Sequence, residues 1–155
     1  MSYRITGLAP DRFRSLFGLS DAALAAHGAR RLIADTKPGF PDRVELRDAE
    51  PGEAVLLVNF VHQPADTPYR ASHAIFVREG ATEAYDRIDE VPDALRRPAI
   101  SLRAFDAGGM MVDAEVVDGR TLEAAIERLL ADRDATYMHA HYAARGCYAA
   151  RVERA

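Results

Sequence analysis

Two apolar runs separated by a polar loop dominate the hydrophobic pattern of this chain. The first run, at 55–61, consists of large apolar residues interrupted only by Asn59. A run this short and rich in valine predicts a strand buried on both faces, because a half-exposed strand would alternate apolar and polar residues. The second run, at 74–77, ends at a charged turn and predicts a partner strand.

The segment between these runs is polar and contains two prolines. Proline cannot donate to a sheet ladder, so 63–70 is expected to form a loop, with His62 and His73 at its two ends. Loops held between buried strands often carry binding or catalytic groups. The alternative is an ordinary hairpin connection in which both histidines have structural partners.

The C-terminal half predicts a hairpin, a helix and two further strands. Alternation over 99–105 and 110–117, joined by a glycine-rich turn, indicates an antiparallel hairpin. Apolar residues at helical spacing over 121–131 predict an amphipathic helix that packs on the sheet. Strands are then expected at 136–142 and 147–153.

The N-terminal half shows weaker patterns. Proline at position 10 and glycine at position 18 frame a short helix over 10–17, and Ser20 is a candidate N-cap for a helix that stops at Gly28. Short strands are expected at 4–8 and 30–35. Val44 and Leu46 alternate with charged residues, which predicts a strand with one wet face. The segment 81–97 is expected to form helical turns or an irregular crossover.

Together these elements predict an α+β fold in a single domain over residues 1–155. Its core is expected to be one mostly antiparallel sheet of about six strands, covered on one face by one long amphipathic helix at 121–131, with short helices near the N-terminus. The six predicted strands are 54–62, 72–78, 99–105, 110–117, 136–142 and 147–153.

Charge and composition exclude several classes of function. The formal net charge of -4 argues against a nucleic-acid-binding protein, which would carry a basic surface. No stretch approaches the roughly 18 consecutive apolar residues that a membrane-spanning helix needs. The first residues lack the basic head and apolar core of a secretory signal, so a cytoplasmic location is expected.

The pair His139 and His141 raises the question of a transition metal. Alternation along a strand places both imidazoles on one face, where they can supply two neighbouring ligands, and a third could come from His62, His73 or Asp66. Zinc or iron(II) would suit such ligation. The alternative is structural: one histidine packs in the core and donates to a backbone carbonyl, while the other meets solvent. The pattern favours this alternative.

Cys147 is the only cysteine and is a candidate nucleophile. If 143–146 forms the turn, Cys147 faces Tyr142, and the two histidines of that strand point to the opposite face. Only a bulge or a one-residue slip would bring them together. A small buried cysteine is therefore the preferred interpretation.

Tyr69 and Arg70, with Arg78 further on, could form an anion pocket, since the arginine fork matches carboxylate and phosphate. A salt bridge within the protein, or contact with a partner, explains the same residues equally well.

Several stretches also resemble a known family. KPGFP, DAEPGE, NFVHQPADTPYRASHAIFVRE and RGCYAARVER together are similar to a bacterial single-domain family of about this length whose function is not known. The resemblance covers nearly the whole chain. It implies a bacterial single-domain protein and supplies no activity, substrate or catalytic residue.

These observations lead to two functional hypotheses. The first is a small-molecule-binding or enzymatic pocket formed by the 62–73 loop near the strand of His139 and His141, for a small polar or anionic ligand. Its candidate ligand-binding residues are His62, Asp66, Tyr69, Arg70 and His73. The second is a non-catalytic interaction module without a small-molecule site, for example a homodimer.

Overall fold

The computed structural model describes residues 1–155 and contains nine strands and two α-helices. The strands are β1 (Tyr3–Thr6), β2 (Arg30–Ile33), β3 (Ala54–Gln63), β4 (Ala71–Arg78), β5 (Asp86–Ile88), β6 (Ile100–Phe105), β7 (Met111–Val117), β8 (Tyr137–Tyr142) and β9 (Tyr148–Arg154). The helices are α1 (Asp21–Ala26) and α2 (Leu122–Ala131), and single 3₁₀ turns lie at Pro10–Arg12, Arg14–Leu16, Asp93–Leu95 and Gly119–Thr121. Every pair of neighbouring strands is antiparallel, which confirms an α+β fold built mostly on antiparallel pairing.

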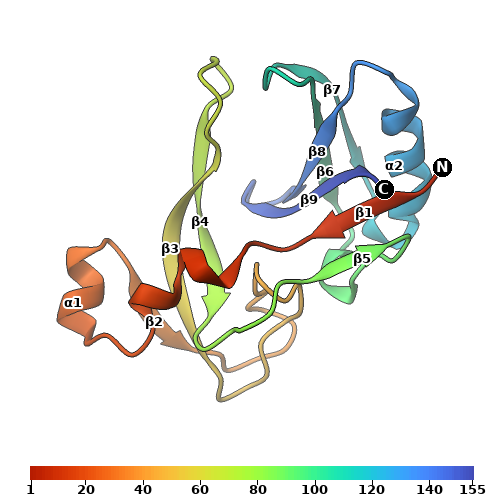
Figure 1. Ribbon diagram of the computed structural model, residues 1–155. Helices are drawn as coiled ribbons and strands as arrows, with labels where there is room; N and C mark the ends of the chain where they lie inside the picture. Colours follow the sequence, from red (N-terminus) through yellow and green to blue (C-terminus); the bar gives the residue numbers. More distant parts are fainter.

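The strands form two sheets rather than the single sheet predicted from the sequence. One sheet has six strands in the order β5-β1-β9-β8-β6-β7, and the other has three in the order β2-β3-β4. The β3–β4 hairpin therefore belongs to a separate sheet, and Figure 1 shows it standing beside the larger one. Alternation within a strand reports its local environment and carries no information about which strands share a sheet, so the sequence pattern could not separate the two.

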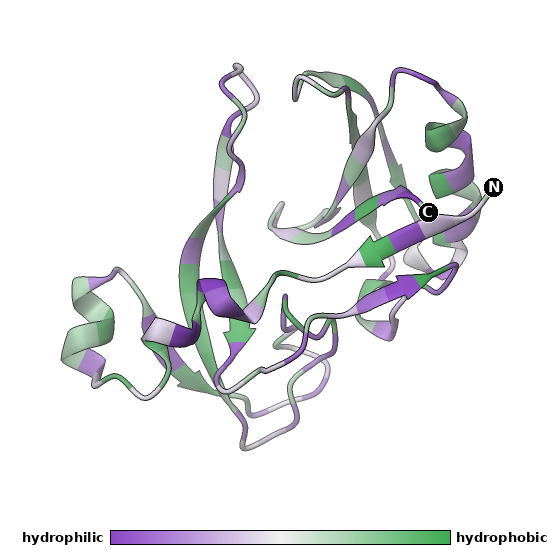
Figure 2. Ribbon diagram, viewed as in Figure 1, coloured by the Kyte–Doolittle hydropathy of each residue, from purple (hydrophilic) through white to green (hydrophobic).

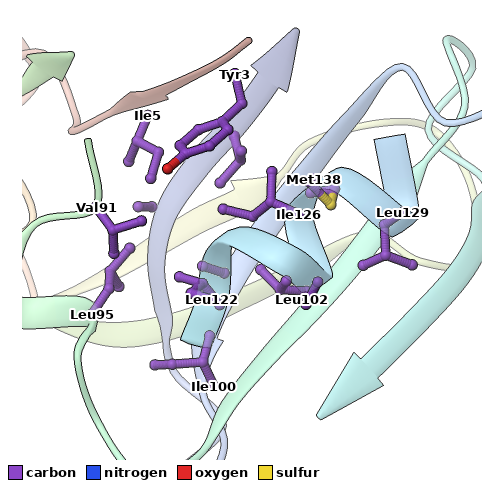
Figure 3. Packing of buried hydrophobic residues seen from close by; sticks show 14 of the residues in the cluster. Tyr3, Ile5, Val91, Leu95, Ile100, Leu102, Leu122, Ile126, Leu129 and Met138 are labelled. Carbon is purple, nitrogen blue, oxygen red and sulfur yellow. The ribbon is translucent and has the colours of Figure 1, made fainter. Parts of the chain in front are cut away.

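Helix α2 covers the face of the six-stranded sheet that lies away from the β3–β4 hairpin (Figure 1). Its apolar residues recur at helical spacing and all are buried: Leu122, Ala125, Ile126, Leu129 and Leu130. They pack against Leu102 and Met138 of the sheet in a core of 19 buried residues (Figure 3). The helix is shorter than the predicted 121–131 and is not a long one, because residues 119–121 form a 3₁₀ turn ahead of it.

The β3–β4 hairpin changes character along its length. Its lower part is largely hydrophobic, and its upper part, toward the loop, is more hydrophilic (Figure 2). In the lower part Leu56, Val58, Ile75 and Val77 are buried in a second core of 11 residues that also contains Leu24 of α1. Further along, Asn59 and Val61 are exposed, so the prediction that 55–61 is buried on both faces holds only for its first residues.

The segment around residue 44 is not the predicted strand with one wet face. It makes only the isolated bridges Pro41↔Asp48 and Asp42↔Phe76, and Leu46 has a positive φ of 51°. Val44 is buried in the core of the small sheet and Leu46 in that of the large sheet. The alternation thus reflects a connection that passes between two cores.

The N-terminal elements agree in part with their prediction. The helix predicted over 10–17 is replaced by two single 3₁₀ turns, whereas α1 is capped as expected by the Ser20 side chain, which accepts a hydrogen bond from the Ala23 amide. The crossover at 81–97 contains the short strand β5 and one 3₁₀ turn. Neither α-helix has the length and apolar character that crossing a membrane requires.

Candidate functional site

The candidate site lies between the two sheets, on the face of β8 opposite to α2. Alternation along β8 sends Met138 and Ala140 into the core beneath α2. His139 and His141 therefore point to the other face, toward the β3–β4 hairpin. They are 4% and 0% exposed, respectively, so both are inside the molecule rather than on a solvated surface.

Four histidines from three strands meet there, and we call them the histidine cluster: His62 of β3, His73 of β4, and His139 and His141 of β8. The ring of His62 stacks on that of His73, with centroids 4.8 Å apart. The ring of His141 stands edge-on to both, at 4.9 Å from His62 and 5.5 Å from His73. The fifth histidine of the chain, His27, lies at the end of α1 and takes no part.

Two β-bulges lie at the cluster. In the β3–β4 pair Val61 faces Ser72 and Gln63 faces Ala71, which leaves His62 as the extra residue. In the β8–β9 pair Ala140 faces Ala150 and His141 faces Tyr148, which leaves Ala149 as the extra residue. Bulges redirect side chains and are over-represented next to functional sites.

The second bulge follows Tyr148 along β9, so that Arg151 rather than Ala150 pairs with His139. Tyr148 lies opposite His141, in the register that a turn at 143–146 implies, and its ring stacks on His62 with centroids 5.3 Å apart. Cys147 is only partly buried, and its Sγ accepts a hydrogen bond from the Arg43 guanidinium at 3.2 Å. It is therefore not the buried core cysteine that the sequence favoured.

Contacts at the tip of the β3–β4 hairpin hold it against the large sheet. The Gln63 amide donates to the Tyr137 hydroxyl at 2.9 Å, and the Thr67 hydroxyl donates to the Gly109 carbonyl at 3.2 Å. Gly109 has a φ of +84°, and a Cβ at this position would overlap Ala65. A glycine is thus required at the turn between β6 and β7 for the hairpin to approach this closely.

The hydrogen bonding of the cluster is incomplete. Nε2 of His62 lies 2.8 Å from Nδ1 of His73, and Nδ1 of His141 lies 2.9 Å from the Gly146 carbonyl. Since a carbonyl only accepts, His141 carries its proton on Nδ1 and has a lone pair on Nε2. That nitrogen, together with Nδ1 of His62 and Nδ1 of His139, is buried without any partner.

Burial keeps these imidazoles neutral. It lowers the pKa of His139 and of His141 to about 3 and that of His62 to about 4, with a further contribution from neighbouring histidines and from Arg103. Burial also lowers the pKa of His73. Neutral imidazole is the form that binds metals.

Three members of the cluster are close enough to share a metal ion. One ring nitrogen each from His62, His73 and His141 lies within 4.8 Å of the others. Ligands bound to zinc at about 2.1 Å in tetrahedral geometry are about 3.4 Å apart, so the separations need to shorten by about 1.4 Å at most. The structure thus groups His62 and His73, from the two ends of the predicted loop, with His141 of the predicted pair. His139 lies beside this group and is not part of it.

A cavity reaches the cluster from one side. It has a volume of about 330 Å³ and is lined by His73, Arg43, Cys147 and Arg145, among others. A second cavity of about 430 Å³ shares Arg43, Phe76, Arg145 and Cys147 with the first and continues to Tyr142 and Arg97. His73 is the member of the cluster that faces this space.

The other ligand candidates from the sequence lie apart from the cluster. Asp66, Tyr69 and Arg70 are exposed at the hairpin tip, and none lines either cavity. Arg70 donates to the Pro64 carbonyl within its own loop. Arg78 forms a salt bridge with Glu45 at the far end of β4. The structure thus brings together the two histidines at the base of the loop and leaves its polar tip outside.

Sequence reasoning missed three residues of the site, namely Arg103, Tyr148 and Arg43. Arg103 could have been found, because it alternates with the buried residues of β6 and pairs with His139 on β8. Tyr148 could also have been found, because a turn at 143–146 that pairs Cys147 with Tyr142 pairs Tyr148 with His141. Arg43 lies in the connection between the sheets, where no periodicity points to it.

Comparison with known proteins gives one result. No curated protein and no solved structure matches the chain. The sequence model of a family described as "Protein of unknown function (DUF1203)" matches residues 39–154, a range that contains the whole histidine cluster and both cavities apart from Pro38. Because this range is most of the 155 residues, the chain belongs to the DUF1203 family.

Proposed function

We propose that this protein binds a divalent transition metal, such as zinc or iron(II), through His62, His73 and His141. The metal would form the inner end of a small-molecule pocket between the two sheets. The observation that carries this proposal is the close approach of one ring nitrogen each from His62, His73 and His141, two of which, His62 and His141, also have a buried ring nitrogen without a partner.

The energetic cost of these nitrogens supports a ligand. A buried polar group without a hydrogen bond costs about 1–3 kcal/mol, and native proteins keep few of them. Three such nitrogens lie in the cluster, and two of them belong to His62 and His141, which are proposed ligands. Coordination of a metal would satisfy such a lone pair, and neutral imidazole is the preferred form for this role.

The arrangement around His141 also resembles that of a metal ligand. Histidines that bind metals usually donate their second ring nitrogen to a carbonyl or carboxylate, which fixes the tautomer and the ring orientation. The Gly146 carbonyl has this position relative to Nδ1 of His141. His141 is fully buried, so its ring is held in place by packing as well.

Three protein ligands favour a reactive site over a purely structural one. Structural zinc sites usually have four protein ligands, whereas catalytic sites have three and keep a position for water or substrate. A metal in such a site polarises the bound oxygen. The cavity lined by His73 and Cys147 would give a small molecule access to that position.

The metal content of the purified protein tests this proposal. Protein produced without a histidine tag and purified without chelator is expected to contain about one equivalent of transition metal by elemental analysis, or to take it up on addition. Replacing His62, His73 or His141 with alanine should abolish binding. His27→Ala is the matched control, since His27 is exposed at the end of α1, and it should bind as the parent does. Less than a tenth of an equivalent after addition of zinc and of iron(II) would contradict the proposal.

A specific observation also favours self-association as a second candidate function. Strand β7 is at the edge of the large sheet, and its residues Val112 and Val116 are 38% and 65% exposed. Edge strands with exposed apolar side chains readily pair with another strand. The partner we infer is β7 of a second copy of this chain, and the mass of the protein in solution tests it.

A further inference from the structure

Arg103 on β6 lies beside the histidine cluster. It is the cross-strand partner of His139, and Ser101, two residues earlier, is the partner of His141. Residues paired across two strands lie on the same face of the sheet. The Arg103 side chain therefore extends from the face that carries the histidines, and it contributes to the lowered pKa of all four.

The guanidinium of Arg103 has almost no partner within the protein. Its Nε donates to the Ser101 hydroxyl at 3.2 Å, while Nη1 and Nη2 make no hydrogen bond and no salt bridge. Its burial is intermediate, and desolvation lowers its pKa. An arginine that is partly removed from water without a carboxylate is costly unless an anion compensates it.

Two other arginines near the cluster are already engaged, whereas Arg145, which lines the cavity with His73, makes no hydrogen bond and no salt bridge. Arg151, on the opposite side of His139, pairs with Glu153 and lies over the Tyr137 ring at 4.1 Å. Arg43 donates to two backbone carbonyls and to Cys147. Arg103 is thus the arginine paired with the histidine strand β8 across the sheet whose two terminal nitrogens are free to bind a ligand.

The charge of the site also requires an anion. The three candidate metal ligands are neutral histidines, and no aspartate or glutamate belongs to the group. A divalent metal there, next to the Arg103 guanidinium, would leave several positive charges in a poorly solvated space. Such sites need compensation by a negatively charged ligand.

We propose that a small molecule with an oxyanion group, of the carboxylate or phosphate type, binds at the histidine cluster, and that Arg103, which lines neither cavity but extends from the same sheet face as His139 and His141, binds this group next to the metal. This inference rests on the proposed function and adds the chemical class of the ligand. The guanidinium fork gives two parallel hydrogen bonds to such a group, which fixes the orientation of the molecule relative to the metal. In this proposal Arg103, rather than the exposed Arg70 suggested by the sequence, binds the anion.

Cobalt(II)-substituted protein provides the test, because its visible absorption reports on the surroundings of the metal. The cobalt affinity is measured first for the parent, Arg103→Gln and Arg103→Lys proteins. Each cobalt form is then titrated separately with acetate and with inorganic phosphate. Arg133→Gln is the matched control, since Arg133 is an exposed arginine without protein partners in the loop after α2.

The expected result separates anion binding from metal binding. Arg103→Gln should keep the cobalt affinity of the parent and bind acetate or phosphate about tenfold more weakly or worse, because a hydrogen-bonded charge is lost. Arg103→Lys should retain part of the affinity, since it keeps the charge without the fork. Arg133→Gln should behave as the parent. A preference for one anion identifies the carboxylate or the phosphate class.

Two other results would contradict the proposals, one the role of Arg103 alone and the other the metal site. If the parent binds cobalt normally and its anion titration is the same in Arg103→Gln, or shows no response, the role of Arg103 is wrong and the metal site stands. If the parent does not bind cobalt at all, the proposed function fails, and the inference about Arg103 fails with it.

Discussion

At the residue scale, the histidine cluster is defined by what burial does to imidazole. His139 and His141 have pKa values lowered to about 3, and His62 has a pKa of about 4, because the charged form loses its hydration inside the protein. In the unfolded chain the same side chains have an ordinary pKa of about 6.5. The unfolded state therefore binds protons that the folded state excludes.

This difference predicts that the metal-free protein loses stability in mild acid. Stability should be nearly constant above pH 6.5 and should fall as the pH drops from 6.5 toward 4, by up to about 1.4 kcal/mol per pH unit for each buried histidine. Urea unfolding at pH 7.5, 6 and 5 measures the effect. The measurements stop at pH 5 because carboxylates with a lowered pKa, such as Glu53 with a pKa of about 2, also make stability depend on pH below that value.

The His139→Gln variant tests whether the buried histidines cause this dependence of stability on pH. It removes one depressed titration and should flatten the dependence between pH 6.5 and 5, whereas the control His27→Ala should leave it unchanged, since His27 is exposed. Equal free energies of unfolding at pH 7.5 and pH 5 in the parent protein would show that these imidazoles are not held neutral in the folded state.

At the element scale, the site depends on how the β3–β4 hairpin docks on the β6–β7 turn. His62 and His73 belong to the hairpin, and His141 belongs to the large sheet. Gly109→Ala should push the hairpin away, because the new Cβ overlaps Ala65. We expect a loss of about 1–3 kcal/mol in the free energy of unfolding, together with weaker metal binding, measured by urea unfolding and by zinc titration.

Gly80→Ala is the matched control for this variant. Gly80 also has a positive φ, of +88°, but no atom lies near the position of its Cβ. The substitution should therefore cost stability through backbone strain alone and leave the zinc affinity unchanged. If both variants bind zinc equally well, the docking of the hairpin does not position the ligands.

The elements themselves could largely be predicted from the sequence, whereas their grouping could not. Alternation located β6, β7, β8 and β9, and helical spacing located α2, since these patterns depend on one buried face. The division into two sheets depends on which strands pair over long distances, and that information is absent from local periodicity. Val44 and Leu46 mislead for a related reason, because the two sheets bury them in different cores.

The candidate site was predicted in its residue types and only partly in its geometry. The β8 pair could be assigned to one face from period-2 alternation, and His62 and His73 to the ends of one loop. That all four meet depends on how the β3–β4 hairpin docks on the large sheet and on the bulge at His62, where one extra residue shifts the register. No residue type in the sequence predicts this bulge or the docking, so the meeting of the two pairs of histidines could not be predicted.

At the scale of the whole molecule, the exposed edge of β7 predicts self-association. We expect the parent protein to be a dimer in light scattering coupled to size exclusion, and Val116→Lys to be a monomer, because a charged residue on an edge strand opposes pairing. Ile88→Lys is the control. Ile88 is 60% exposed on β5, at the other edge of the same sheet, and its substitution should leave the dimer intact. A monomeric parent protein at tens of micromolar or above excludes association through β7.

The most direct test of the metal site is an anomalous diffraction experiment on crystals grown with zinc. Data collected on the two sides of the zinc absorption edge should give one strong peak between the β3–β4 hairpin and β8, with nitrogens of His62, His73 and His141 at about 2.1 Å. Crystals of His141→Ala should lack this peak. A map of the parent protein without density there, or with zinc only at surface residues such as His27, would contradict a metal centre at the histidine cluster.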